Sequence, residues 1–184
     1  MPRIPPLTPP YPPEVAETFS RLMPEGMEPL RLFRTLAHNP RVLRRVQRGG
    51  LLDPGSVSVR QRELAILRTC ALCGAAYEWG VHATLFGGIA RFDDAQLEST
   101  WTGAELASWA DDERVIIRTC EALHATSQLS TDAWSSLREH FDQAQCIELV
   151  TLAGLYHAVS FVVNATQVEA EPWARQAPQV DASQ

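Results

Sequence analysis

The sequence predicts an all-α fold in a single domain. Apolar residues recur at helical spacing from about residue 15 to residue 165, whereas the alternation typical of strands is weak throughout. Helix-start patterns occur at Ser58 with Gln61 and at Thr102 with Glu105, and both fit a capping box. A length of 184 residues with 45% hydrophobic residues suits one domain with a sizeable core.

The two ends of the chain differ from the rest in composition. Residues 1–13 contain seven prolines, which lack an N–H and have a fixed φ, so an extended polyproline-like arm is expected there. This arm is either a loose terminus or a segment that wraps a neighbouring subunit. The helical domain is expected over residues 14–169. Residues 170–184 form a polar tail that we expect to fray.

Three short helices are expected before residue 50, one starting near Val15, one over 30–37 and one over 41–48. Asn39-Pro40 separates the last two, and Gly49-Gly50 ends the third, since glycine accepts left-handed C-cap geometry.

A longer helix is expected to begin at Ser58 and to run to Cys73, where Gly74 interrupts it. The next helix is expected over 75–86. Further helices are predicted over 93–100, 102–109, 112–125, 131–140 and 144–165. The last of these is apolar almost all round, which is typical of a helix in a core or in an oligomer interface.

Composition excludes several function classes. All 16 basic residues are arginine, so lysine Schiff-base and Walker-type chemistry are excluded. A net charge of −6 argues against non-specific nucleic-acid binding. No apolar run reaches the length of a membrane span, and the N-terminus does not resemble a secretory signal, so a cytoplasmic location is expected. No haem, flavin or nucleotide motif is present, and we expect no cofactor.

Glu78 and His82 are the first candidates for chemistry. Their i, i+4 spacing puts both side chains on one face of the predicted helix. A carboxylate beside an imidazole orients it and raises its basicity, so the pair can pass a proton near neutral pH.

Glu63 is the third candidate, and its role depends on Gly74. In a continuous helix Glu63 would lie about 28 Å along the axis from His82. If the chain turns back at Gly74, the two helices form a hairpin in which Glu63 and His82 face each other.

These residues lie in a block that resembles the carboxymuconolactone decarboxylase and alkylhydroperoxidase D-like superfamily. The resemblance covers residues 28 to 169 and rests on LFRTLAHNP (32–40), GGLLDPGSVSVRQRELAILRT (49–69), YEWGVH (77–82), EALH (121–124) and GLYHAVSFVVNA (154–165). It implies an alkylhydroperoxidase D-like helical bundle and a homo-oligomer, as a dimer, trimer or hexamer. A monomer mass in light scattering would refute self-association.

The resemblance also separates two branches of that superfamily. In the thiol peroxidase branch, a Cys-x-x-Cys pair stands between the Glu and the His of the motif. Here Glu63 and His82 match the Glu and the His, but the cysteine positions fall on Ala75 and Glu78. This resembles the decarboxylase branch, and it implies that Glu63, Glu78 and His82 act on a lactone acid, with Glu78 orienting His82.

The chain has its own CxxC pair, Cys70 and Cys73, upstream of that position. The pair lies among apolar residues near a helix C-terminus, where the dipole opposes a thiolate, so core packing is the favoured interpretation and a redox role the second. Metal binding is disfavoured, because no second CxxC or paired histidine completes a ligand set. His124 and His157 are expected to be satisfied core histidines.

Other side chains near the motif carry two interpretations each. Tyr77 and Trp79 either line a pocket or pack between helices. Arg60, Arg62 and Arg68 either bind an anionic substrate or lie on solvated helix faces.

Three functions follow as hypotheses. The first is a small-molecule enzyme that uses Glu/His proton transfer, on a lactone acid or a related compound. The second is a thiol peroxidase that uses Cys70 and Cys73, and the third is a non-catalytic oligomeric accessory protein. A closed core at Glu78 would favour the third, and a pocket there would count against it.

Overall fold

The protein is all-helical in its described residues, 1–104 and 108–179 of a computed structural model. The helices are α1 (Pro13–Leu22), α2 (Arg31–Leu36), α3 (Pro40–Gly49), α4 (Val59–Leu72), α5 (Ala76–Phe86), α6 (Asp94–Thr102), α7 (Asp111–Thr126), α8 (Thr131–His140) and α9 (Gln143–Thr166). The all-α prediction is therefore confirmed.

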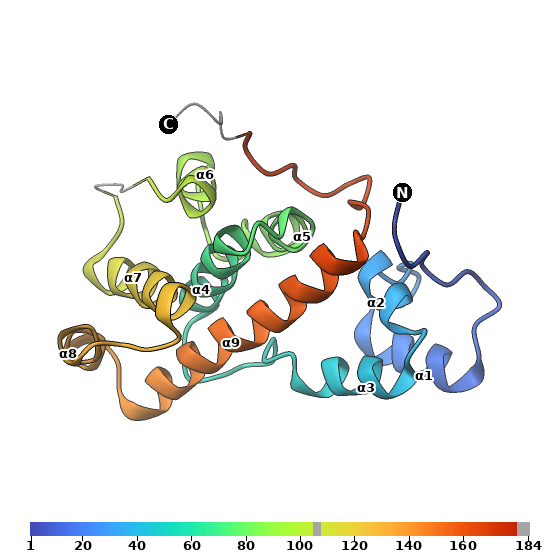
Figure 1. Cartoon of the computed structure of the whole chain (residues 1–184), viewed down its shortest axis with the longest axis horizontal. Helices are drawn as coiled ribbons and strands as arrows, with labels where there is room; N and C mark the ends of the chain where they lie inside the picture. The colour runs from blue at the N-terminus through green and yellow to red at the C-terminus, as the bar shows by residue number, and fades with distance from the viewer. Residues whose placement is uncertain (105–107, 180–184) are drawn as a thin grey trace.

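Helix α4 is the centre of the domain. It packs against α5, α6, α7 and α9, and its residues from Arg62 to Cys70 are all buried. Its start is fixed by the predicted capping box, in which Ser58 and Gln61 each satisfy the other's backbone N–H. Helices α1, α2 and α3 form a separate group beside α9 (Figure 1), where α3 contacts both α1 and α2.

The prediction for residues 102–109 is wrong in its described part. Helix α6 continues to Thr102, and Gly103 then ends it with a φ of 77°. Residues 108–110 are not helical. Residues 105–107, including the Glu105 of the expected capping box, lie outside the described residues.

Helix α9 passes the length and composition test for a membrane span, with 24 residues and a mean hydropathy of 1.8 over its most apolar 18 residues. This differs from the expectation that no apolar run reaches the length of a membrane span. Core helices of folded domains pass the same test, and α9 packs against α4, α5, α7 and α8. Its outer face remains apolar in places, since Ile147 is 67% exposed and Phe161 is 65% exposed.

The proline-rich arm lies on its own chain. The Arg3 N–H donates to the Thr166 carbonyl at 2.8 Å, and the Leu7 N–H donates to the Arg34 carbonyl at 3.2 Å. Leu7 and Tyr11 pack against the core. The arm is therefore extended, as its proline content predicts, and these contacts hold it against the domain.

The tail after Glu169 does not fray in its described part, contrary to expectation. Buried Glu171 accepts hydrogen bonds from the Tyr77 hydroxyl and the Arg31 N–H. Further along, the Arg175 N–H donates to the Thr84 hydroxyl at 2.7 Å. The tail therefore crosses α5, and it does so over Gly80, where an added Cβ would overlap the Arg175 carbonyl oxygen.

Gly80→Ala is expected to lower the free energy of unfolding by roughly 1–3 kcal/mol, because the tail backbone must move off α5 to admit the methyl group. Gly154→Ala in α9 is the matched control, since a Cβ there meets no atom within 4 Å. Urea unfolding measures both, and trypsin cleavage at Arg175 reports release of the tail. Equal stability of the two variants would show that the tail does not pack closely on α5.

Candidate functional site

The site is built on a hairpin of α4 and α5. Gly74 joins them with a φ of +62°, a left-handed conformation that glycine adopts without a steric penalty. The Ala75 N–H then donates to the Cys70 carbonyl at 2.8 Å, which closes the turn after α4. The turn brings two residues 19 positions apart, Glu63 and His82, to the same level of the hairpin.

Glu63 and His82 are in direct contact, as the hairpin predicted. Glu63 Oε2 lies 2.7 Å from His82 Nδ1, and their side chains are 0% and 4% exposed. The other oxygen of Glu63 accepts from Arg62 Nε at 2.9 Å, and Arg62 also donates to the Leu52 carbonyl. Glu63 therefore orients the imidazole, whereas the sequence analysis assigned that role to Glu78.

The second ring nitrogen of His82 faces the cavity side of the site. The Tyr156 hydroxyl lies 3.1 Å from His82 Nε2, and Glu78 Oε1 lies 3.5 Å from it. Sequence reasoning missed Tyr156. It lies in the quoted stretch 154–165, but nothing in the spacing along α9 indicates which side of that helix faces His82.

The charges around His82 favour its protonated form. Burial lowers the pKa of His82, but hydrogen bonds and charge interactions from Glu63 and Glu78 outweigh it and raise the pKa from 6.5 to about 9. The carboxylates of Glu63 and Glu78 carry two negative charges, and the Arg62 guanidinium and the His82 imidazolium carry two positive charges. The group is therefore neutral, which suits its burial. At neutral pH, His82 is therefore a proton donor at both nitrogens.

A cavity of about 850 Å³ opens onto His82, between the α1–α3 group and the helices α5 and α9. Glu78, His82 and Tyr156 supply polar groups to its wall, while Glu63 lies behind His82 and outside the cavity. The other polar lining residues are Arg21, Gln47, Arg48 and Asp53. Most other lining residues are apolar. They include Leu22, Met23, Met27, Leu30, Leu32, Phe33, Leu85, Phe86, Leu155 and Val159. A volume of this size and lining is typical of a small-molecule site.

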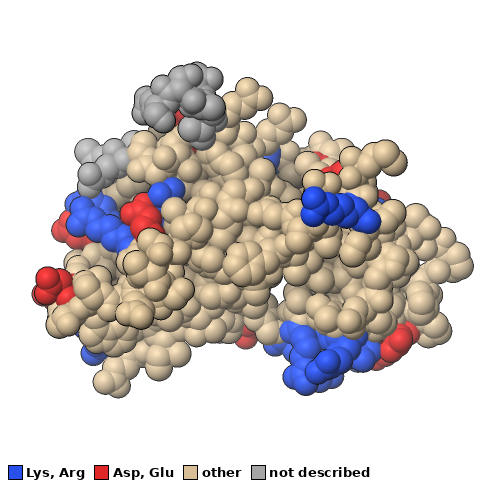
Figure 2. Space-filling view, viewed as in Figure 1, with Lys and Arg blue, Asp and Glu red and all other residues tan. Residues whose placement is uncertain are grey.

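Two arginines, Arg21 and Arg48, also line the cavity. Arg21 forms an exposed ion pair with Glu17 at 2.6 Å. Arg48 lies in the last turn of α3, which carries four of the sixteen arginines of the chain. Figure 2 shows a group of basic side chains over α3, so positive charge gathers beside the cavity although the whole chain is acidic.

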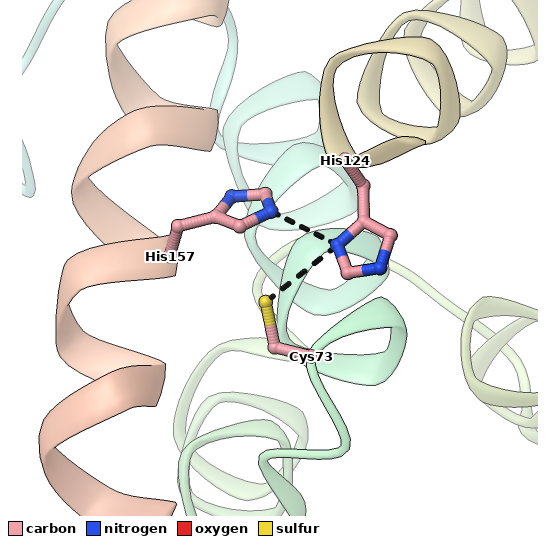
Figure 3. Close-up of side chains that lie close together, drawn as sticks. All are labelled: Cys73, His124 and His157. Atoms are coloured by element: carbon pink, nitrogen blue, oxygen red, sulfur yellow. Dashed lines mark hydrogen bonds between the residues drawn. The ribbon is translucent and has the colours of Figure 1, made fainter. Parts of the chain in front are cut away.

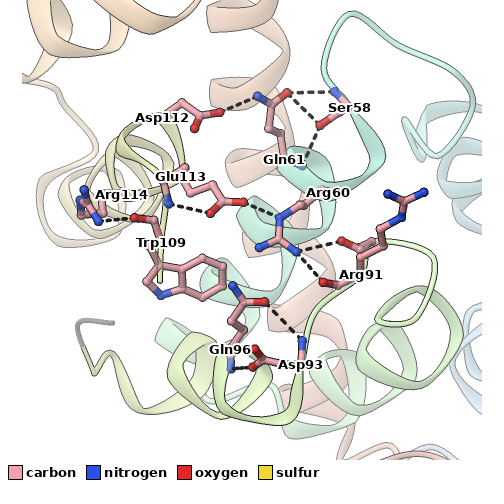
Figure 4. Close-up of polar contacts among 12 residues, drawn as sticks. Ser58, Arg60, Gln61, Arg91, Asp93, Gln96, Trp109, Asp112, Glu113 and Arg114 are labelled. Atoms are coloured by element: carbon pink, nitrogen blue, oxygen red, sulfur yellow. Dashed lines mark hydrogen bonds and ion pairs between the residues drawn. The ribbon is translucent and has the colours of Figure 1, made fainter. Parts of the chain in front are cut away.

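The arginines near the motif are structural. Arg60 pairs with Glu113 of α7 and donates to the carbonyls of Ala90 and Arg91, so that it ties the start of α4 to its neighbours (Figure 4). Arg68 pairs with Glu121 and donates to the Thr100 carbonyl. Neither lines the cavity. Arg68 is buried, so a solvated helix face is wrong for it, whereas Arg60 is partly exposed.

The two aromatic residues that flank Glu78 pack between helices. The Tyr77 hydroxyl accepts from the Leu32 N–H and donates to Glu171, while Trp79 Nε1 donates to the Thr100 hydroxyl at 2.9 Å. Neither lines the cavity.

The cysteines of the CxxC pair are free thiols outside the cavity lining. Cys70 is fully buried and Cys73 is partly exposed. Burial raises the pKa of the Cys70 thiol well above its ordinary value, and the negative charge of Glu78 adds to this effect. This environment disfavours a thiolate at Cys70.

Comparisons with known proteins identify the fold. No protein-family model and no curated protein matches the chain. Among solved structures, an alkylhydroperoxidase AhpD core protein from Ralstonia eutropha JMP134, described as an uncharacterized peroxidase-related protein, aligns with a TM-score of 0.80. The alignment covers 92% of this chain and 93% of that one, at 16% identity. The chain has an alkylhydroperoxidase D-like fold.

Two other solved structures agree on this fold. A peroxidase-related protein from Silicibacter sp. TM1040 aligns with a TM-score of 0.76 at 16% identity, over 90% of this chain and 88% of that one. The debrominase Bmp8 aligns with a TM-score of 0.72 at 13% identity, over 92% of each chain. Such low identities show the shared alkylhydroperoxidase D-like fold and leave the reaction to the residues of this chain.

The raised pKa of His82 predicts a pH-dependent stability. The imidazolium gains its partners only in the folded state, so its stabilisation is complete below pH 6.5 and is lost as the pH rises through about 9. A rise from 6.5 to about 9 corresponds to about 3 kcal/mol.

Urea unfolding between pH 6 and pH 10 measures this loss. In His82→Gln the loss should shrink to the background of the other groups, while His140→Gln, at an exposed site on α8, should behave like the wild type. The assignment is wrong if wild type and His82→Gln lose the same stability over this range.

Proposed function

We propose that the chain is a small-molecule enzyme that works by proton transfer at His82. One observation carries the proposal: Glu63 holds His82 Nδ1 at 2.7 Å, while His82, with Glu78 and Tyr156 beside its Nε2, lines a cavity of about 850 Å³. A histidine fixed on one side by a carboxylate, with its other nitrogen toward a cavity, is the arrangement that general acid–base catalysis requires.

The residues then take separate roles. Glu63 and Arg62 are positioning residues, because they lie behind His82 and outside the cavity. His82 donates a proton from Nε2. The Tyr156 hydroxyl accepts from Nε2 and keeps its own hydrogen, so it can hydrogen-bond a substrate oxygen. Glu78, at the cavity wall, lies 3.5 Å from His82 Nε2 and stabilises the imidazolium that donates the proton.

The substrate class that fits best is a compact organic acid with an apolar body, and a conjugated lactone acid is the specific proposal. The apolar walls would hold the ring, and Arg48 at the cavity edge would attract the carboxylate. In decarboxylation, the C–C bond to CO₂ breaks and its electron pair enters the conjugated lactone carbonyl as an enolate. His82 then protonates the enolate at carbon, and CO₂ leaves.

His82→Gln is expected to lower kcat on carboxymuconolactone by about 100-fold or more, because the general acid is lost. Loss of the lactone absorbance follows the reaction. Glu63→Gln should lower kcat less and move the alkaline limb of the pH profile to lower pH, since the Glu63 carboxylate helps to raise the pKa of His82. His140→Gln is the matched control. Unchanged turnover in His82→Gln would contradict the role of His82.

A thiol peroxidase is the second candidate function. One observation favours it: two of the solved structures with this fold are described as peroxidase-related. Oxidation of the pair by a hydroperoxide would form the Cys70–Cys73 disulfide, with the peroxide O–O bond cleaved to water and alcohol.

Hydrogen peroxide should leave Cys70 and Cys73 reduced if the first proposal is right, because burial disfavours the Cys70 thiolate. Intact mass spectrometry with a metal chelator present measures the outcome, since the disulfide removes two hydrogens. Cys70→Ser/Cys73→Ser is the control for oxidation elsewhere. A two-dalton loss in the wild type that the double variant lacks, together with dithiol-dependent peroxide turnover, would instead support the peroxidase.

The accessory-protein hypothesis has the least support. It predicted a closed core at Glu78, and a cavity lined by Glu78 and His82 counts against it. Homo-oligomer formation remains part of the proposal, supported by the exposed apolar side chains Ile147 and Phe161 on α9.

A further inference from the structure

Three side chains that can bind a metal ion meet outside the cavity. Cys73 follows the end of α4, His124 lies in the last turn of α7, and His157 lies in α9 (Figure 3). Cys73 Sγ lies 3.9 Å from His124 Nδ1, and His124 Nδ1 lies 3.0 Å from His157 Nε2. The three ligand atoms all lie within 4.8 Å of one another.

These separations are close to those in a metal site. With Zn–S near 2.3 Å and Zn–N near 2.0–2.1 Å, tetrahedral ligands lie about 3.6 Å apart for sulfur and nitrogen and about 3.3 Å apart for two nitrogens. The observed 3.9 Å between Cys73 and His124 and 3.0 Å between the two histidines each lie within a few tenths of an ångström of these values. Figure 3 shows the three side chains directed toward a common point, from the end of α4 and from helices α7 and α9.

The atoms behind these ligands hold them in place. His157 Nδ1 lies 2.7 Å from the Ala153 carbonyl oxygen and donates its hydrogen there, so Nε2 carries the free lone pair that a metal needs. The Asn164 side chain donates to the Cys73 carbonyl at 2.8 Å and fixes the backbone at the end of α4. A histidine anchored through its second nitrogen to a carbonyl is a regular feature of metal sites.

The ligand types indicate which metal fits. One thiolate and two imidazoles select a borderline transition metal such as Zn²⁺, and they disfavour Mg²⁺ and Ca²⁺, which prefer oxygen ligands. On binding, the Cys73 thiol releases its proton to solvent. His124 is exposed, so a fourth position on that side is open to water.

We propose that Cys73, His124 and His157 form a mononuclear site for a zinc-type divalent transition-metal ion, with a fourth position open to solvent. The ion joins the ends of α4 and α7 to the middle of α9. It also holds Cys73 as a metal thiolate, which removes this residue from disulfide formation with Cys70. None of the three ligands lines the cavity, so this site does not depend on the function proposed for His82.

The sequence analysis disfavoured this site because it found no paired histidine. The pair exists only in the fold: His124 and His157 are 33 positions apart, on α7 and α9, and their rings lie 5.2 Å apart between centroids. Both were expected to be core histidines, but His124 is exposed and His157 is only partly buried.

Titration of the phosphine-reduced, metal-free chain with Co²⁺ and then with Zn²⁺ tests the proposal. One equivalent of Co²⁺ per chain should produce a thiolate-to-cobalt charge-transfer band. It should also produce intense visible absorption bands, which are typical of a cobalt ion with a low coordination number. Zn²⁺ should displace it and raise the thermal midpoint. Cys73→Ala should abolish the charge-transfer band, and His157→Ala should weaken Zn²⁺ binding by about tenfold or more.

Matched controls separate the site from incidental binding. Cys70→Ala removes the other cysteine of the CxxC pair, and His140→Ala removes an exposed histidine of α8, so both should bind like the wild type. If Cys73→Ala and His157→Ala fold and bind Zn²⁺ as tightly as the wild type, or if the wild type shows no saturable binding, the site does not exist. Turnover of carboxymuconolactone tests the proposed function of His82. It is measured separately, so failure of that proposal leaves the metal-binding result unchanged.

Discussion

The contact between Glu63 and His82 is the constraint on which the centre of this fold depends. Both groups are ionisable and almost completely buried, and each is stable there only because the other faces it across the α4–α5 hairpin. Arg62 and Glu78 complete the balance of charge. Removing one member would leave a buried charge unpaired, at a cost of about 3–5 kcal/mol.

The same hairpin carries two groups of ionisable side chains along its length. Away from the turn, His82 contacts Glu63 on one side and lines a cavity with mostly apolar walls on the other. At the turn, Cys73 lies close to His124 and His157, and none of the three lines that cavity. The side chains of the first group are buried, while those of the second lie partly in solvent. Helix α9 serves both, because adjacent residues Tyr156 and His157 point to different sides of it.

Much of the fold was predictable, because helix boundaries are set by local signals. The capping box of Ser58 with Gln61 and the break at Gly74 each act within one turn of the chain. The tail was predicted wrongly for the opposite reason. Its polar composition suggested fraying, but Glu171 is a polar residue that is buried on Tyr77, which is distant in sequence.

The sequence by itself determined the helical class, the break at Gly74 and the placement of Glu78 and His82 on one helix face, since helical periodicity and one glycine fix those relations. Only the tertiary structure decided that Glu63 orients His82, that Tyr156 joins them, that Arg60 and Arg68 are ion-paired, and that two histidines meet at Cys73. These contacts join separate helices, and the rotation of one helix against another is set by core packing, which no local pattern along the chain records.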